Sequence, residues 1–244
     1  MDIAINTVSY TNYYDLENSI DVISDLGVKY VEIYGEWPHA WPDDLDRAAR
    51  VRLRKKVQDY GLEILTLGVG LGFAASPGIA SSNQLIRNNH QLHMEKLADL
   101  AYDIEANYLN ILSGKILPHM SYQEGYNNSV NELKKLSKYV EKLNVAILLE
   151  NTIDKMYITN TPTSLTKLIQ DIDYEEIYIR FDPQHANVTK IDLEILFDFF
   201  KRNFEKIAMI GIHDNMGDMD SHLPLGHGNV NHDQIFEELK KLNY

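Results

Sequence analysis

Three polar residues stand at the ends of three successive short apolar runs, where they could hold a metal ion. Glu150 ends VAILLE, Asp182 follows IYIRF and His213 follows AMIGI. Their separations, 182 − 150 = 32 and 213 − 182 = 31, match the roughly 31 residues per strand–helix unit of a barrel of about 250 residues. Two carboxylates and an imidazole that converge away from water are costly without a cation. Mixed oxygen and nitrogen ligands favour Zn, Mn, Co or Fe over Ca.

A second group of candidate ligands lies in the segments that follow these runs. His185 comes three residues after Asp182, and Asp220 and His222 lie in the polar, glycine-rich segment GDMDSHLPLGHGNV. Such loops carry the working residues of many folds, so we expect His185, Asp220 and His222 to form a cluster beside the first. For His222 alone, an ordinary surface-loop histidine is an equal alternative.

Each acidic residue also has a simpler interpretation. An acid at a strand end is more often a helix cap or a solvated loop residue, and an Asp before a proline, as at Asp182–Pro183, commonly starts a turn. The regular spacing of three such residues, with histidines nearby, makes the metal site the better interpretation.

Further residues are candidates for contacts to a substrate or to the ligands. Asp214 and Asn215 follow His213 directly and are expected to orient the ligands, and Asn215 is also a candidate substrate contact. Glu32, in VEIYGE, is expected to point to the barrel interior, where it contacts substrate or forms a structural ion pair with Arg180.

Composition limits the classes of function and partner. The chain has 244 residues, no cysteine and a net charge of −13, so thiolate zinc sites and cysteine nucleophiles are excluded. Strong acidity disfavours nucleic acid and anionic membranes as partners. We see no signal peptide and no apolar run of the roughly 20 residues that cross a bilayer, so we expect a cytoplasmic protein.

Short apolar runs alternate with amphipathic stretches, which predicts seven strand–helix units in one domain, residues 1–244. The expected strands are 3–8, 30–34, 62–67, 108–112, 145–149, 177–181 and 207–212. The expected helices are 15–26, 45–60, 83–105, 122–143, one starting at Thr161–Pro162, 192–203 and 232–242.

Two architectures fit this alternation: a doubly wound open sheet and a TIM (β/α)8-type barrel. The turn after the first expected strand reads SYTNYYD and has no glycine, so the phosphate-binding loop typical of the open nucleotide-binding sheet is absent. The barrel is therefore the expected fold.

The segments VEIYGE, LLENT, RFDPQHAN and IHDNMGDMDSHLPLGHGNVN resemble the xylose isomerase-like TIM-barrel superfamily. That superfamily includes sugar-phosphate isomerases and epimerases, ketose 3-epimerases, inosose dehydratase and endonuclease IV. The resemblance runs from the first strand to the last helix and is most specific from residue 147 to 231.

The resemblance implies roles for particular residues. In the epimerase branch it assigns metal ligation to Glu150, Asp182 and His213 and a substrate contact to His185. In the endonuclease branch, His185 would join Asp220 and His222 around a further zinc. The earlier metal histidines of that branch are missing, since the matching segments read LTLGVGLG and LNILSGK. A trinuclear zinc site is therefore not expected.

The family's fourth ligand, an eighth-strand glutamate, would fall past Tyr244. We therefore expect a barrel that lacks or alters its eighth strand, closed by a partner chain as in a homo-oligomer, by an additional segment or by tighter packing.

The resemblance implies a metal-dependent sugar or sugar-phosphate isomerase or epimerase that acts through a metal-stabilised enediolate. Glu150 would transfer the proton and His185 would orient a substrate hydroxyl. One alternative is an endonuclease IV-like phosphodiesterase acting on abasic DNA. The other is a non-catalytic barrel that binds a sugar or a protein partner.

Overall fold

The computed structural model describes residues 2–68, 78–153 and 155–244. By its internal contacts, the chain divides into two compact units. The first comprises Met1–Gly78, Asn83–Leu112 and Lys135–Ile147. The second comprises Ile79–Ser82, Ser113–Lys134 and Leu148–Tyr244.

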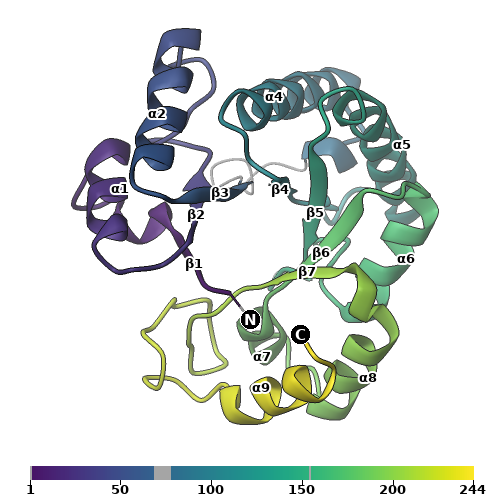
Figure 1. Cartoon of the computed structure of the whole chain (residues 1–244). Coiled ribbons are helices and arrows are strands. Elements are labelled where there is room, and N and C mark those ends of the chain that lie inside the picture. Colours follow the sequence, from purple (N-terminus) through teal and green to yellow (C-terminus); the bar gives the residue numbers. More distant parts are fainter. Residues whose placement is uncertain (1, 69–77, 154) are drawn as a thin grey trace. The chain divides into compact units, whose positions relative to one another are not determined.

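The first unit contains four strands in the order β1-β2-β3-β4, with parallel pairing (Figure 1). The strands are β1 (Ala4–Asn6), β2 (Tyr30–Tyr34), β3 (Glu63–Gly68) and β4 (Tyr108–Ile111). The helical elements are η1 (Thr7–Tyr10), α1 (Leu16–Ser24), α2 (Arg47–Asp59) and α4 (Gln84–Asp103).

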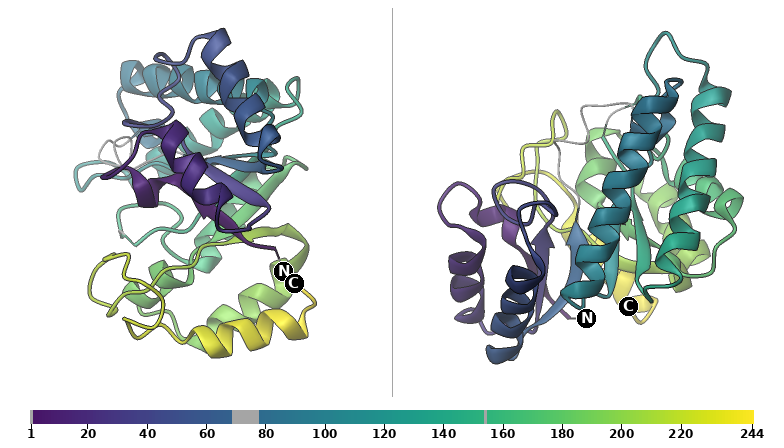
Figure 2. Two further views of the ribbon diagram at one scale, coloured as in Figure 1. Left: turned by 60° about the vertical axis from the view of Figure 1, so that its left-hand side comes forward. Right: turned by 90° about the horizontal axis from the view of Figure 1, so that it is seen from above.

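Local sequence signals determine where these helices start and how they pack. Asp15 caps α1, since its carboxylate accepts a hydrogen bond from the backbone N–H of Asn18 at 2.8 Å. Helices α2 and α4 lie side by side (Figure 2). Arg50 in α2 joins them, because its guanidinium donates to the carboxylate of Asp103 in α4 at 2.9 Å. The same guanidinium donates to the carbonyl of Leu45, just before α2, at 2.8 Å.

The second unit contains the strand order β5-β6-β7, and β6 and β7 pair in parallel. Three elements are divided between the units. β5 (Ala146–Glu150) and η2 (Gly78–Ala80) begin in the first unit and end in the second, whereas α5 (Tyr122–Val140) begins in the second and ends in the first. The remaining strands are β6 (Ile177–Phe181) and β7 (Ile207–Ile210). The other helical elements are α6 (Pro162–Ile172), α7 (Pro183–Val188), α8 (Leu193–Asn203), η3 (Phe204–Lys206) and α9 (His232–Lys241).

An aromatic cluster anchors β6 in the core of the second unit. The Phe181 ring lies 4.9 Å from Phe199 and 5.3 Å from Phe200, between ring centroids. Helices α8 and α9 lie side by side (Figures 1 and 2), and Lys201 forms an ion pair with the buried Glu238 carboxylate at 3.0 Å. The aromatic contacts fix β6, the strand that Asp182 directly follows.

The structure confirms the expected strand–helix alternation and the TIM-barrel-type α/β fold. In a doubly wound sheet the strand order reverses around an internal first strand, whereas the order from β1 here shows no reversal. The described residues form seven strands, and α9 is the last element.

Two local expectations need correction. The first strand ends at Asn6, not Val8, because the Asn6 side chain accepts the Val8 N–H at 2.8 Å and starts η1. Residues 183–188 form the short helix α7 and are more than a turn: Asp182 is its cap and Pro183 its first residue.

None of the described helices is both long enough and apolar enough to span a bilayer.

Candidate functional site

The predicted site residues of the second half of the chain all belong to the second unit. Glu150 is the last residue of β5, and Asp182 directly follows β6. His213, Asp220 and His222 lie in the long segment between β7 and α9, drawn in yellow-green in Figure 1.

The two carboxylate oxygens of Asp182 have different tasks. Oδ1 accepts the backbone N–H groups of Gln184 and His185, at 2.9 and 3.1 Å, as the cap of α7. Oδ2 lies 3.0 Å from Nε2 of His213. A Cβ at Gly211 would lie 2.9 Å from Oδ2, so glycine is needed at this position directly after β7. Oδ2 takes no part in this cap and is therefore the oxygen that could bind a metal ion.

Asp220 brings the loop histidine to the strand-end residues. Its Oδ2 lies 3.3 Å from Nε2 of His185 and 3.1 Å from Nε2 of His222. Its Oδ1 lies 4.0 Å from Nε2 of His213. The rings of His213 and His222 stack in parallel, 3.9 Å apart with an interplanar angle of 5°.

Among the described residues, two groups of side chains could each hold a metal ion. Asp182, His185 and His213 form one, and His213, Asp220 and His222 form the other; the ligand atoms of each lie within 4.8 Å of one another. His213 is common to both. The structure thus brings together five of the six predicted ligand residues, although not in the two sets that the sequence suggested.

The carboxylates of this cluster favour the charged forms of its histidines. Burial lowers the pKa of His185, but Asp182, Asp220 and Glu150 outweigh that effect and raise it to about 10. The hydrogen bond to Asp220 raises the pKa of His222 above its ordinary value. Burial opposes ionisation of Asp220, yet its bonds to His185 and His222 hold its pKa well below the usual range. The same carboxylates would favour a metal cation, which would replace the protons on the imidazoles that it binds.

Glu150 lies beside this cluster, outside both groups. One carboxylate oxygen lies 3.4 Å from Nε of Arg180, and the other lies 3.8 Å from Nδ1 of His185. Its assignment as a metal ligand stays a prediction.

Asp214 holds the loop that carries Asp220 and His222. Its buried carboxylate accepts the backbone N–H groups of Asn215, Gly226 and Val230 at 2.9, 3.0 and 3.2 Å. Burial alone would raise the pKa of Asp214, but these backbone donors lower it overall. A Cβ at Gly228 would overlap the Asp214 carboxylate, so the loop closes around this side chain.

Asn215, predicted to orient ligands and to contact substrate, is fully buried. Its amide donates to the Gln184 carbonyl at 3.0 Å, and its side-chain oxygen accepts from Asn187 Nδ2 at 2.8 Å and from Gly217 N at 2.9 Å. These bonds tie the loop after β7 to α7, which agrees with an orienting role. The substrate contact stays a prediction.

Glu32, the predicted substrate contact in β2, belongs to the first unit. It is 2% exposed, and its carboxylate accepts a hydrogen bond from the Asn6 side chain at 2.6 Å. Its contact to substrate and its pairing with Arg180 both stay predictions.

Asn151 also belongs to this site, although the sequence analysis did not predict it. Its side chain bonds both backbone groups of Asp182, and its carbonyl lies 2.7 Å from Nδ1 of His185. Its position directly after Glu150 was the available signal, because residues next to a strand-end ligand often form the outer shell of a metal site.

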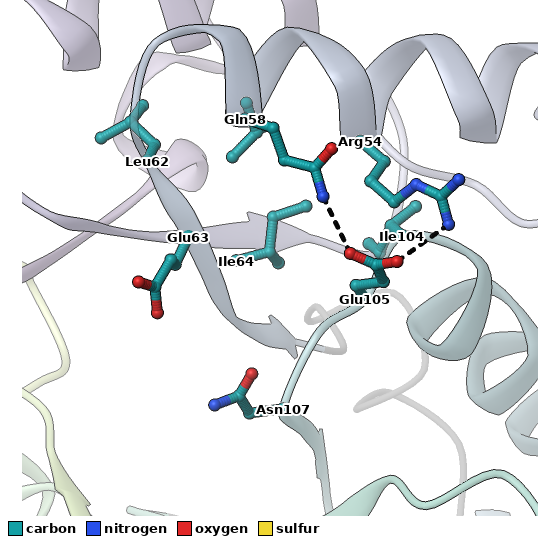
Figure 3. Close-up of a pocket in the computed structure, with 9 residues that line it drawn as sticks. Arg54, Gln58, Leu62, Glu63, Ile64, Ile104, Glu105 and Asn107 are labelled. Atoms are coloured by element: carbon teal, nitrogen blue, oxygen red, sulfur yellow. Dashed lines mark hydrogen bonds and ion pairs between the residues drawn. The ribbon is translucent and has the colours of Figure 1, made fainter.

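A surface pocket of about 220 Å³ lies elsewhere, in the first unit (Figure 3). Glu105 accepts hydrogen bonds there from Arg54 at 3.1 Å and Gln58 at 2.8 Å. Glu63, which begins β3, and Asn107, which precedes β4, also line it. The amino-terminal ends of barrel strands serve stability more than catalysis, and none of the predicted site residues lies in this pocket.

Among curated proteins, an uncharacterized protein of Methanocaldococcus jannaschii is 30% identical over 178 residues, which cover 68% of this chain and 57% of that protein. A second uncharacterized protein of the same organism is 26% identical over 166 residues, with 68% and 62% covered. The chain thus spans about three fifths of the length of these relatives. Fructoselysine 3-epimerase of Escherichia coli O157:H7 is 22% identical over 224 residues, with 88% and 77% covered.

Solved structures show the same fold. A D-tagatose 3-epimerase-like protein superposes with a TM-score of 0.86 at 25% identity, covering 100% of this chain and 88% of that chain. A putative xylose isomerase from Rhodospirillum rubrum gives a TM-score of 0.87 at 16% identity, with 100% and 87% covered. The protein-family model described as xylose isomerase-like TIM barrel matches residues 20–244 of this chain. The chain therefore belongs to the xylose isomerase-like TIM-barrel family.

Proposed function

We propose that this protein is a metal-dependent isomerase or epimerase of a sugar or sugar phosphate. The observation that carries the proposal is the convergence of Asp182, His185 and His213, joined by Asp220 and His222, after the carboxyl ends of β6 and β7. Active sites of TIM barrels lie at that end of the strands. The similarity to sugar 3-epimerases supports this class of reaction.

The side chains present fit a divalent transition metal. In the described residues, Oδ1 of Asp220 and Nδ1 of His213 are buried without a hydrogen-bond partner. Buried polar atoms normally have a partner, and Asp220 Oδ1 lies 4.0 Å from Nε2 of His213, an imidazole that could share a cation with it. Carboxylate and imidazole donors suit Zn, Mn, Co or Fe. Asp182, His185, His213, Asp220 and His222 are the proposed ligands, and Glu150 remains a further candidate.

A bound divalent metal would polarise the substrate carbonyl and stabilise negative charge on its oxygens. In our proposal, Glu150 removes the proton from the carbon next to that carbonyl, which gives an enediolate of the substrate. It then delivers the proton to the former carbonyl carbon while the hydroxyl proton passes between the two oxygens, which completes a one-base isomerisation. Glu150 is suited to this because it lies at the edge of the cluster, with Arg180 and His185 on either side. His185 orients a substrate hydroxyl.

The variant Glu150→Gln tests this role. We expect loss of turnover by at least about 100-fold, since general acid–base groups typically contribute 10²–10⁴-fold, with the thermal midpoint nearly unchanged. The assay offers D-tagatose, D-psicose, L-ribulose, fructoselysine and their phosphates, with Mn²⁺, Co²⁺ or Zn²⁺ added. Glu194→Gln, at the exposed first turn of α8, is the control. Undiminished turnover by Glu150→Gln would exclude Glu150 as the proton-transfer group.

An endonuclease IV-like phosphodiesterase is a second candidate, favoured by one observation: beside Asp182, His185 and His213, the side chains of Asp220 and His222 offer further metal ligands, which a centre with more than one ion needs. The net charge of −13 opposes binding to DNA. Cleavage of an abasic-site oligonucleotide at low salt would establish this activity. Saturable sugar binding without turnover of any sugar would instead favour a non-catalytic binding protein.

A further inference from the structure

Asn151 lies directly after β5 and is 3% exposed. Its side-chain amide makes two hydrogen bonds to the same backbone unit: Nδ2 donates to the Asp182 carbonyl at 2.9 Å, and Oδ1 accepts the Asp182 N–H at 2.7 Å. Both backbone groups at the end of β6 are therefore held by one side chain. The position of the Asp182 Cα, and with it that of the carboxylate, follows from this pair of bonds.

The same residue also fixes an imidazole. The carbonyl oxygen of Asn151 lies 2.7 Å from Nδ1 of His185. A carbonyl can only accept, so Nδ1 must carry a hydrogen and donate it. The other ring nitrogen, Nε2, then lies 3.3 Å from Asp220 Oδ2 and 3.8 Å from Asp182 Oδ2. The ring of His185 is thereby oriented with Nε2 toward the carboxylates of the cluster.

We propose that Asn151 is the positioning residue of this site: its side chain holds Asp182 and its backbone carbonyl sets the ring orientation and the ligating nitrogen of His185. The inference rests on the proposed metal site and extends it, since it assigns a role to a residue outside both candidate metal-binding groups. Asparagine suits the position because it offers a donor and an acceptor on one short, uncharged side chain. Aspartate lacks the donor, and glutamine is one methylene longer.

The test compares cobalt binding by the wild-type chain, Asn151→Ala and Asn151→Ser. Co²⁺ is titrated into apo protein at a temperature well below every thermal midpoint, and the ligand-field absorption spectrum is recorded at saturation. Loss of outer-shell partners typically weakens metal binding 10- to 100-fold. We expect a loss in that range for Asn151→Ala with an altered spectrum, and a smaller loss for Asn151→Ser, whose hydroxyl can still reach one backbone group.

Asn203→Ala is the matched control. Asn203 belongs to the same unit, is half-buried, and uses its side chain to bond the Phe199 carbonyl at 2.9 Å and the Thr166 hydroxyl at 3.3 Å. We expect it to lower the thermal midpoint but to leave the Co²⁺ dissociation constant and spectrum unchanged. An equal loss of Co²⁺ affinity in Asn203→Ala would mean that general destabilisation explains the effect, which would overturn the positioning role.

Amide hydrogen exchange in the absence of metal gives a second readout. The Asp182 N–H should exchange faster in Asn151→Ala than in the wild type, because the side-chain oxygen that accepts it has gone. If the wild-type chain binds Co²⁺ and Asn151→Ala binds it equally well, the result contradicts the positioning role but not the proposed function. If the wild-type chain binds no Co²⁺, the result contradicts both the metal-dependent function and the positioning of metal ligands by Asn151.

Discussion

At the scale of single residues, the histidines of this chain differ according to their neighbours. His185 and His222 lie against the Asp220 carboxylate, which favours the charged imidazolium and raises the pKa of each ring. His93, 7% exposed, packs its ring 4.6 Å from that of Trp41. Burial there lowers the pKa of His93 from 6.5 to about 4. Identical side chains thus prefer opposite charge states.

The lowered pKa of His93 predicts a sensitivity to acid. Between pH 6.5 and about 4 the unfolded chain holds a proton at this position that the folded chain does not, so the free energy of unfolding falls as the pH falls through that window. The contribution is at most about 3.5 kcal/mol, at about 1.4 kcal/mol per pKa unit. His93→Phe keeps a ring against Trp41 and should lose less stability between pH 7 and pH 4.5, measured by urea unfolding.

Removal of an exposed histidine, His119→Gln, controls for the change of residue type. Equal pH dependence in His93→Phe and the wild type would show that His93 does not carry the acid sensitivity.

The site residues were mostly foreseeable at this scale. Strand-end position and regular spacing pointed to Asp182 and His213, and the structure brings both into one group. Asn151 was not foreseen, because its role depends on hydrogen bonds to the backbone of a residue 31 positions away. Nothing in the residue type distinguishes it from an ordinary loop asparagine.

At the scale of elements, the start of α6 shows how local sequence determines a helix boundary. Thr161 and Ser164 form a capping box: the Thr161 hydroxyl accepts the Ser164 N–H at 3.1 Å, and the Ser164 hydroxyl accepts the Thr161 N–H at 3.1 Å. Pro162 occupies the first turn, where no N–H is needed. The sequence therefore predicted this boundary correctly.

Loss of that cap should destabilise the protein measurably. We expect Thr161→Ala to lower the free energy of unfolding by about 1 kcal/mol, since it removes a partner of an otherwise unsatisfied N–H group. The matched control is Thr163→Ala, the same substitution at an exposed position in the first turn of α6. It should be neutral or slightly stabilising, because alanine is the better helix former. Chemical denaturation of the three proteins compares them, and equal stability of both variants would contradict the capping role.

At the scale of the whole molecule, the two units share elements of secondary structure. Strand β5 begins in the first unit and ends in the second, and α5 begins in the second and ends in the first. Unfolding either unit would therefore break elements of the other. This continuity supports the proposal that residues 1–244 form one domain.

We accordingly expect one cooperative thermal transition. Differential scanning calorimetry should give a calorimetric enthalpy equal to the van't Hoff enthalpy, the sign of two-state unfolding. The fluorescence of Trp37 and Trp41, which report on the first unit, should change at the same temperature as the far-ultraviolet circular dichroism of the whole chain. Two resolved transitions would contradict a single domain.

The sequence by itself determined the alternation of strands and helices and most of their boundaries. It did so because burial and capping act over a few residues, through hydrophobic periodicity, Gly and Pro signals and cap side chains. Regular spacing also placed Glu150, Asp182 and His213 at the ends of successive strands. In the structure Glu150 ends β5 and Asp182 directly follows β6, whereas β7 already ends at Ile210, before His213.

Only the tertiary structure decided how the ligand residues are grouped. The sequence suggested Glu150 with Asp182 and His213, whereas the structure groups His185 with Asp182 and leaves Glu150 beside Arg180. That grouping depends on side-chain rotamers and on hydrogen bonds across strands. The loop after β7 is shaped by the buried Asp214 carboxylate, through N–H groups up to 16 residues away in the chain. Such long-range contacts arise from packing, and no local pattern in the sequence encodes them.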